Sequence, residues 1–203
     1  MDPYIFAGDR NAYLDGPCLQ DPSNIPDIPA LAHALAHINR FTGHTVRPYS
    51  VAEHSLLCCE IARNQPLVQA LPHKDQARAM LACLTHDLHE ALVGDMAAPI
   101  KRIVGKAWTD FEDRVERAVL DAHGLLPIAE EFAELVKQVD LIALATEKRD
   151  LLDTDSQWGV LKGTAPADFL SLSRDADAAP AYWARQFVEC YLALWNVIKG
   201  EDQ

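Results

Sequence analysis

Apolar residues recur with helical spacing over most of the chain. From Ala30 onward they return every three or four positions in successive blocks, and no long stretch alternates with the period of two that a half-buried strand shows. The blocks predict helices over residues 30–39, 51–64, 74–92, 106–123, 128–151 and 181–198. We therefore expect an all-α fold, a single helical bundle.

Two segments lack this periodicity. The first 29 residues hold five of the twelve prolines and two glycines, which predicts an irregular N-terminal arm or a short hairpin. Residues 153–180 are rich in Asp, Ser, Gly and Pro, and they predict a long loop that is a candidate lid. We expect one domain over residues 1–203, with the arm at 1–29, a helical core at 30–151, and the loop with a terminal helix at 152–203.

The composition narrows the class of protein. With 18 Lys and Arg against 30 Asp and Glu, the net charge is −12, which repels phosphate backbones and excludes long nucleic acid as an expected partner. No apolar run reaches the roughly 18 residues of a membrane span, and the start at Met1–Pro3 has no basic segment, so we expect neither membrane insertion nor export. Five cysteines without a C-x-x-C pair favour reduced thiols and a cytoplasmic location.

A histidine lies on the apolar face of the helix predicted over 51–64. This helix begins with Ser50 and Glu53 in capping-box spacing, where each side chain can satisfy a free amide of the other residue. His54 follows, and it shares a face with Leu57 and Cys58, so its ring points toward the core. Such a residue is either a satisfied core histidine or a ligand.

Ionisable groups also gather beside the apolar stripe of the helix predicted over 74–92. In an ideal helix His86, Asp87 and Glu90 would fan over about a quarter of the circumference. The alternative is a solvated helix edge that carries an i, i+4 His–Glu pair.

A carboxylate interrupts the apolar run VDLIALA in the helix predicted over 128–151. A buried Asp140 is costly unless it is paired with Lys or Arg or bound to a metal. His54, His86, Asp87 and Asp140 together supply nitrogen and oxygen ligands from three helices, a set that suits a divalent cation. Four protein ligands leave positions open on an octahedral ion, as in catalytic sites.

The order His54, His86-Asp87, Asp140 resembles the H…HD…D signature of the HD-domain metal-dependent phosphohydrolases. The resemblance covers about residues 30–151, and the strings YSVAEHSLL, HDLHEALVGD and TEKRDLL extend it beyond the ligand spacing. It implies an all-α HD domain with these four residues as metal ligands. The resident ion is then a divalent cation, Mn, Co, Ni, Fe, Zn or Mg.

Within this family, the string after the HD pair is similar to that of the bacterial 5′-deoxynucleotidases and their small phage-encoded relatives. Those proteins carry a Glu three residues and an Asp eight residues after the pair, here Glu90 and Asp95. The resemblance implies that both are catalytic, one orienting or deprotonating the attacking water and the other protonating the leaving sugar oxygen. Which residue has which role stays open.

The same resemblance implies a substrate pocket ahead of the first histidine. Arg40 and Phe41 occupy the place of an Arg–aromatic pair, from which Arg40 could bind phosphate and Phe41 could stack on a base or sugar. Lys101 and His44 are further candidates for contact with the substrate.

The expected activity is removal of the 5′-phosphate from deoxyribonucleoside monophosphates, so the expected partner is a small nucleotide. Three alternatives stay open: a deoxynucleoside triphosphate triphosphohydrolase that uses the same site, hydrolysis of guanosine tetraphosphate, and a non-catalytic HD module that binds a nucleotide or a protein partner. We also expect a homodimer or higher homo-oligomer, with the aromatic helix at 181–198 either as a contact or as part of the core.

Overall fold

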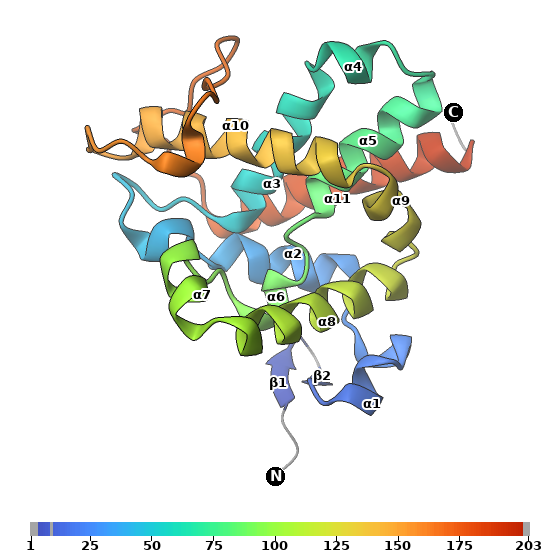
Figure 1. The fold of residues 1–203 in the computed structure, drawn as a ribbon. Helices are drawn as coiled ribbons and strands as arrows, with labels where there is room; N and C mark the ends of the chain where they lie inside the picture. The colour runs from blue at the N-terminus through green and yellow to red at the C-terminus, as the bar shows by residue number, and fades with distance from the viewer. Residues whose placement is uncertain (1–3, 9, 201–203) are drawn as a thin grey trace.

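Helices make up most of the chain (Figure 1). The structure is a computed structural model, and it describes residues 4–8 and 10–200; the start segment Met1–Pro3 lies outside the described residues. The only sheet in the described part of the chain is a two-stranded hairpin. The predicted all-α fold is therefore confirmed, and so is the alternative of a short hairpin in the N-terminal arm.

The hairpin consists of β1 (Tyr4–Ala7) and the antiparallel β2 (Arg10–Tyr13). A short helix α1 (Gly16–Leu19) and a 3-10 turn η1 (Pro22–Asn24) follow it. The Asn24 side chain accepts a hydrogen bond from the Tyr13 amide and donates one to the Tyr13 carbonyl, each 2.8 Å long. These bonds fasten the hairpin to the segment that leads into the bundle.

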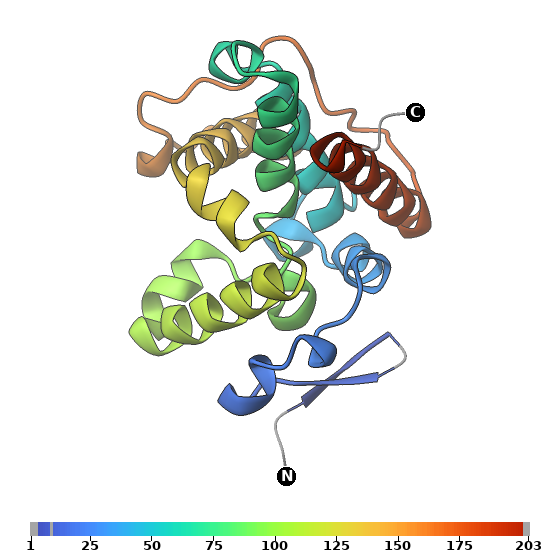
Figure 2. The same ribbon diagram turned by 90° about the vertical axis from the view of Figure 1, so that its right-hand side faces the viewer.

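Five helices form the bundle, with α2 at its lower edge in Figure 2: α2 (Ile28–His37), α3 (Val51–Arg63), α5 (His73–Thr85), α10 (Ala133–Leu151) and α11 (Pro180–Lys199). α3 and α5 pack against each other, and both contact α10 and α11. α2 packs against α3 and α11. The faces between these helices bury the apolar stripes that the sequence pattern predicts.

Shorter elements connect the long helices. They are α4 (Pro66–Gln69), α6 (Glu90–Val93), α7 (Ala98–Val104) and α9 (Leu126–Glu131), together with the longer α8 (Lys106–Ala122). α8 contacts α7 and α9 and also η1 of the N-terminal arm. α8 lies beside the lower end of the bundle and above α1 in Figure 2, while β1 of the hairpin contacts α2 directly.

The single helix predicted over 74–92 is wrong in its second half. α5 ends at Thr85, and from there the chain makes tighter turns in which the amides of Leu88 and Glu90 bond to carbonyls three residues back. The helical pattern continues through this segment because Leu88 and Leu92 are both buried. The helix predicted over 128–151 is also divided, at Phe132, into α9 and α10.

The capping box at the start of α3 forms only in part. Ser50 Oγ accepts a hydrogen bond from the Glu53 amide at 3.2 Å, as expected. The Glu53 carboxylate instead binds the Arg47 guanidinium with two bonds of 2.9 and 2.6 Å. A buried cation is the stronger partner for this carboxylate, because a charge-assisted bidentate pair exceeds a bond to a neutral amide.

The long loop after α10 contains one 3-10 turn, η3 (Gly159–Leu161), and is bonded to its surroundings. Arg149 donates to the carbonyls of Ala167 and Leu170 at 2.6 and 2.9 Å, and Asp150 accepts from the Leu172 amide at 2.8 Å. These bonds hold the second half of the loop along α10, while the lid role stays a prediction.

The terminal helix α11 closes the core. Phe187 is 0% exposed and Tyr191 is 6% exposed, so these two aromatic side chains pack inside the bundle. The homo-oligomer stays a prediction. Among the described residues, none of the helices combines the length and the hydropathy of a membrane span.

Replacing Phe187 by Ala should lower the free energy of unfolding by about 3–5 kcal/mol, because a large aromatic ring is removed from a filled interior. Leu192→Ala on the same helix is the matched control, since Leu192 is 50% exposed, and it should cost about 1 kcal/mol or less. Urea unfolding followed by circular dichroism measures both values. Equal effects of the two variants would contradict the assignment of α11 to the core.

Candidate metal centre

Two imidazole rings meet at the centre of the bundle. His54 comes from α3 and His86 from the turn that ends α5, and their Nε2 atoms are 3.3 Å apart. His54 Nδ1 donates to Glu147 Oε1 at 2.6 Å, and His86 Nδ1 donates to the Cys83 carbonyl at 2.9 Å. Because Nδ1 of each ring is engaged as a donor, Nε2 of each ring is the nitrogen turned toward the common centre.

Two carboxylates complete this centre. Asp87 Oδ2 lies 3.4 Å from His54 Nε2 and 3.2 Å from His86 Nε2. Asp140 Oδ1, from α10, lies 3.3 Å from His54 Nε2 and 4.0 Å from His86 Nε2. The structure therefore brings together all four residues that the sequence predicts as metal ligands.

Asp140 is less deeply placed than its apolar neighbours in the sequence indicate. Its side chain is 41% exposed, whereas His54 is fully buried. The expectation of a deeply buried Asp140 is wrong, because its carboxylate lies at the open edge of the centre. Its nearest charged partners among the described residues are the two histidines, so the alternative of a salt bridge to Lys or Arg is not what forms.

The electrostatics of the centre favour a positive charge. Burial opposes the charged form of His86, but the carboxylates of Asp87 and Asp140 outweigh it and raise the pKa of His86 to about 9. Burial likewise opposes ionisation of Asp87, and the charges of His86, His54 and Arg40 nevertheless hold the pKa of Asp87 well below its usual range. A centre that draws protons onto its histidines also attracts a metal cation.

Glu147 is a functional residue that the sequence analysis missed. It is fully buried, it accepts the 2.6 Å bond from His54, and it pairs with Arg40 at 3.2 Å. Burial raises the pKa of Glu147, but the charges of Arg40 and His54 outweigh this and lower it. The signal was present in the sequence, because Glu147 follows Asp140 by seven residues, two turns along the same face of α10.

Arg40 lies directly at the centre. Its Nη1 is 3.5 Å from Asp87 Oδ2, while its Nη2 contacts Glu147. Its Nε is buried and has no hydrogen-bond partner among the described residues. The Arg40 guanidinium therefore contacts both Asp87, a predicted metal ligand, and Glu147, the buried carboxylate that is bonded to His54.

Glu90 and Asp95 lie on the next segment of chain. Glu90 is 3% exposed, and burial together with the charges of Asp87 and Asp95 raises its pKa to about 10. Burial also raises the pKa of Asp95, against the opposing charge of Arg40. The chain turns between these two residues at Gly94, whose φ of +79° is a conformation that glycine adopts at little cost.

The other predicted substrate contacts differ in their positions. Lys101, on α7, is paired with Glu112 at 2.7 Å but still interacts with Glu90 and Asp87. His44 is exposed, and no contact of its ring with the centre is found in the described residues. His89 is buried, and its Nε2 lies 3.7 Å from Glu112 Oε1.

Phe41 has a partner that the sequence analysis did not identify. The centroid of its ring is 6.4 Å from that of Trp158, the residue before the turn η3 in the long loop. The guanidinium carbon of Arg40 lies 5.5 Å from the centroid of the Phe41 ring. An aromatic pair therefore lies next to the arginine that contacts Asp87.

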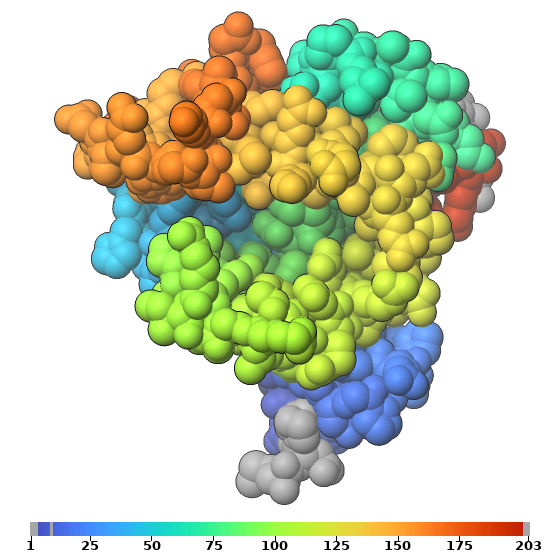
Figure 3. Space-filling model, in the orientation of Figure 1, coloured from blue at the N-terminus to red at the C-terminus, as the bar shows by residue number. Residues whose placement is uncertain are grey.

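The surface is hollowed on the side of the centre. Figure 3 shows a depression between α10 with its following loop and the α7–α8 segment, with the green segment around the end of α5 at its base. Asp140 from α10, His86 from the end of α5, and Lys101 from α7 come from the elements that border this depression. Solvent can reach the centre from this side, as the exposure of Asp140 indicates.

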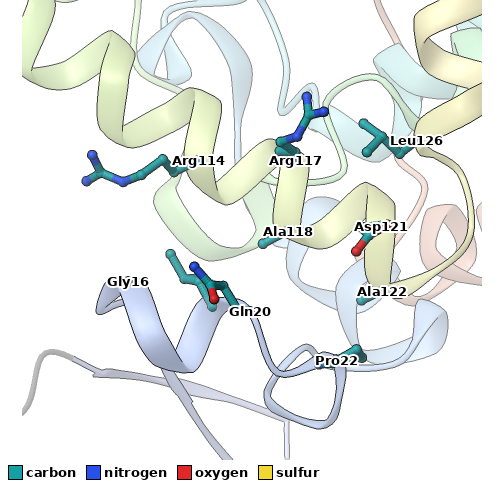
Figure 4. Close-up of a pocket in the computed structure, with 10 residues that line it drawn as sticks. Gly16, Gln20, Pro22, Arg114, Arg117, Ala118, Asp121, Ala122 and Leu126 are labelled. Atoms are coloured by element: carbon teal, nitrogen blue, oxygen red, sulfur yellow. The ribbon is translucent and has the colours of Figure 1, made fainter.

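A separate pocket of about 500 Å³ lies between the N-terminal arm and α8 (Figure 4). Residues that line it include Leu19, Pro22, Arg114, Arg117 and Leu126. None of the four predicted metal ligands lines this pocket, so it is distinct from the metal centre.

The residues of the centre fit a divalent metal ion by their chemistry. His54, Cys58, His86 and Asp140 each offer one ligand atom, and these four atoms all lie within 4.8 Å of one another. Asp87 adds a further oxygen at 3.2–3.4 Å from the two imidazole nitrogens. Imidazole with carboxylate is a usual donor set for first-row divalent ions.

Comparison with known proteins agrees with this geometry. The sequence profile described as HD domain matches residues 32–146 of the chain. The chain is 32% identical over 170 residues to the uncharacterized protein YfdR of Escherichia coli K12, which covers 83% of this chain and 84% of the relative. It is 40% identical over 111 residues to an uncharacterized protein of Rhodobacter capsulatus, with 53% of each chain covered.

The chain therefore belongs to the HD domain family. HD domains bind divalent metal ions, and membership implies a metal-dependent phosphohydrolase. The predicted family and the metal-binding character are confirmed at this level. The relatives' names state no substrate, so the 5′-deoxynucleotidase branch stays a prediction.

Replacing Glu147 by Gln should weaken metal binding by about 10- to 100-fold, because His54 loses the charged partner that fixes its ring. Titration calorimetry with Mn²⁺ measures this affinity. Glu134→Gln, at an exposed position of the same helix, is the control and should bind as the wild type does. Unchanged affinity in Glu147→Gln would contradict the role of Glu147 in orienting His54.

Proposed function

We propose that this protein is a metal-dependent phosphohydrolase that removes the 5′-phosphate from deoxyribonucleoside monophosphates. The observation that carries the proposal is the convergence of His54, His86, Asp87 and Asp140, with Arg40 in contact with Asp87. A cationic centre beside a guanidinium suits a dianionic phosphate. The nucleotide as substrate is supported by the resemblance of the HDLHEALVGD segment to the 5′-deoxynucleotidases.

His54, His86, Asp87 and Asp140 would hold the divalent ion. When bound, such an ion polarises a phosphate oxygen and lowers the pKa of a water molecule toward neutrality. Glu147 keeps the His54 ring oriented through the bond to Nδ1. Arg40 would bind a phosphate oxygen through one terminal nitrogen while its other terminal nitrogen stays paired with Glu147.

Glu90 and Asp95 would divide the proton transfers. Burial and the charges of Asp87 and Asp95 raise the pKa of Glu90, which favours a protonated carboxyl group and suits it to protonate the leaving 5′-oxygen. Its Oε2 is buried without a hydrogen-bond partner in the described residues. Asp95 is less buried, and we assign it the acceptance of the proton from the attacking water.

Base recognition would use the aromatic pair. Phe41 lies beside Arg40, and Trp158 lies beside Phe41, so a nucleotide with its phosphate at the guanidinium could place its base against these rings. Lys101 on α7 lies near Glu90, across the depression from α10, and it would contribute positive charge there. His44 remains a weaker candidate, because it is exposed and has no contact with the centre in the described residues.

Product analysis tests the reaction. The manganese-loaded protein is incubated with an equimolar mixture of a deoxynucleoside monophosphate and a deoxynucleoside triphosphate, and products are followed by phosphorus NMR. Orthophosphate and free deoxynucleoside are expected. Release of intact triphosphate would replace the proposal with a triphosphohydrolase, and no reaction with manganese or cobalt would overturn it for both substrates.

The variant Asp87→Asn tests whether this reaction occurs at the metal centre. Replacing a residue that only orients a metal ligand lowers activity by about 10- to 100-fold. Asp87→Asn should lower activity by more than this, because it removes a predicted ligand itself. Asp110→Asn, at a half-exposed position on α8 where the carboxylate pairs with Lys106, is the control and should keep wild-type rates. Activity in Asp87→Asn equal to that of the control would show that the reaction occurs elsewhere.

Trp158→Ala should raise the KM for the nucleotide about fivefold or more with little change in kcat. The reason is that stacking of a base on an aromatic side chain contributes about 1–3 kcal/mol. Trp158→Phe retains a flat ring and should stay within about twofold of the wild type. Steady-state kinetics on both variants measure the effect, and a fall in kcat at constant KM would argue against a stacking role.

A further inference from the structure

Two thiols from different helices are in contact on the side of α3 that packs against α11. Cys59, on α3, has its Sγ 3.6 Å from the Sγ of Cys190, on α11. The two residues are 131 positions apart in the chain, so the packing of α11 on α3 is what brings them together. Both thiols are reduced in this structure.

The neighbouring cysteine on α3 has different surroundings. Cys58 is 0% exposed, and its sulfur lies against the imidazole of His54, 3.5 Å from Nε2. Successive side chains on a helix point about 100° apart, so the two adjacent cysteines face different parts of the bundle. Cys59 is therefore the thiol of α3 that faces Cys190.

A small movement would convert this contact into a covalent bond. The sulfur–sulfur bond of a disulfide is about 2.05 Å long, so the two sulfurs would have to approach each other by about 1.5 Å. The two helices already pack against each other, and the approach is therefore a local one.

An oxidant would reach Cys190 first. Cys59 is 2% exposed, whereas Cys190 is partly exposed. The hydrogen bond from the Cys59 thiol lowers the pKa of Cys190, although burial opposes this. The charge of Arg63 lowers the pKa of Cys190 as well, and that of Glu60 raises it. The thiolate is the reactive form of cysteine, so exposure and electrostatics favour the same residue of the pair.

We propose that Cys59 and Cys190 form an oxidation site, at which a peroxide converts the two thiols into a disulfide that links α3 to α11. The Cys190 thiolate attacks one peroxide oxygen, the O–O bond breaks, and the second oxygen leaves as hydroxide, which takes up the proton that Cys190 released. Cys190 is then a sulfenic acid.

The Cys59 sulfur completes the reaction by attacking the Cys190 sulfur. The S–O bond breaks, and the hydroxyl group leaves with the thiol proton as water. The two thiols lose two electrons in total, and the peroxide is reduced to two molecules of water. A thiol reductant reverses the link by thiol–disulfide exchange.

The disulfide would restrict a large part of the chain. It closes a loop of about 130 residues, and a cross-link over such a separation stabilises a protein mainly by restricting its unfolded state. Neither Cys59 nor Cys190 is one of the four predicted metal ligands. The proposal therefore does not depend on the proposed function.

Hydrogen peroxide tests the site on the full chain. The reduced, metal-free protein is treated with hydrogen peroxide, material of monomer mass is isolated under non-reducing conditions, and its tryptic peptides are analysed by mass spectrometry. We expect the peptide of residues 41–63 to be joined to the peptide of residues 186–199. Treatment with dithiothreitol should separate them.

Fragment spectra and two matched variants identify the partner, because Cys58 and Cys59 lie in the same peptide. In the wild type, the fragments should place the bond on Cys59. The link should be lost in Cys59→Ala and kept in Cys58→Ala. A link that survives in Cys59→Ala would overturn the proposal. Oxidation of Cys190 to a sulfinic acid while Cys59 stays a thiol, or links that form only between two copies of the chain, would overturn it too.

Thermal unfolding measures the consequence of the link. Oxidation should raise the Tm of the wild-type protein by about 5 °C or more, because the unfolded chain is restricted. Cys190→Ala, treated in the same way, should show no such rise. An unchanged or lowered Tm in the linked wild type would mean that the disulfide strains the native packing, and would contradict a pair that the fold holds ready for oxidation.

Discussion

The buried contact between Glu147 and His54 connects the fold to the metal centre. It joins α10 to α3 through a 2.6 Å hydrogen bond between two side chains that are both 0% exposed. A buried carboxylate of this kind is tolerated only when it is paired, and here Arg40 provides the second partner. The same contact that stabilises the packing of α10 on α3 therefore fixes the orientation of a metal ligand.

One side of the metal centre is buried in the bundle, and the other side is open to solvent. His54 is enclosed, while Asp140 is 41% exposed at the border of the depression in Figure 3. The ion would be held from within the bundle and remain accessible to substrate from outside. Glu90 is 3% exposed, and burial together with the neighbouring carboxylates of Asp87 and Asp95 raises its pKa.

The end of α5 shows how local backbone structure creates the site. If the helix predicted over 74–92 continued, His86 and Asp87 would lie about 100° apart around its axis. The tighter turns after Thr85 instead bring Asp87 Oδ2 within 3.2 Å of His86 Nε2. In the same segment His89 is buried, with its Nε2 3.7 Å from Glu112 Oε1.

The spacing of apolar residues was sufficient to predict the all-α class and the approximate extent of the long helices, whereas the four predicted metal ligands came from ionisable residues on those helices and from the resemblance to the HD signature. These are properties of spacing along one chain, and helical periodicity records them directly. The break after Thr85, the exposure of Asp140, the contact of Glu147 with His54 and the contact of Trp158 with Phe41 depended on the tertiary structure. The physical reason is that they arise between segments as far as 117 residues apart, as for Phe41 and Trp158, whose proximity is set by how the helices and the loop pack.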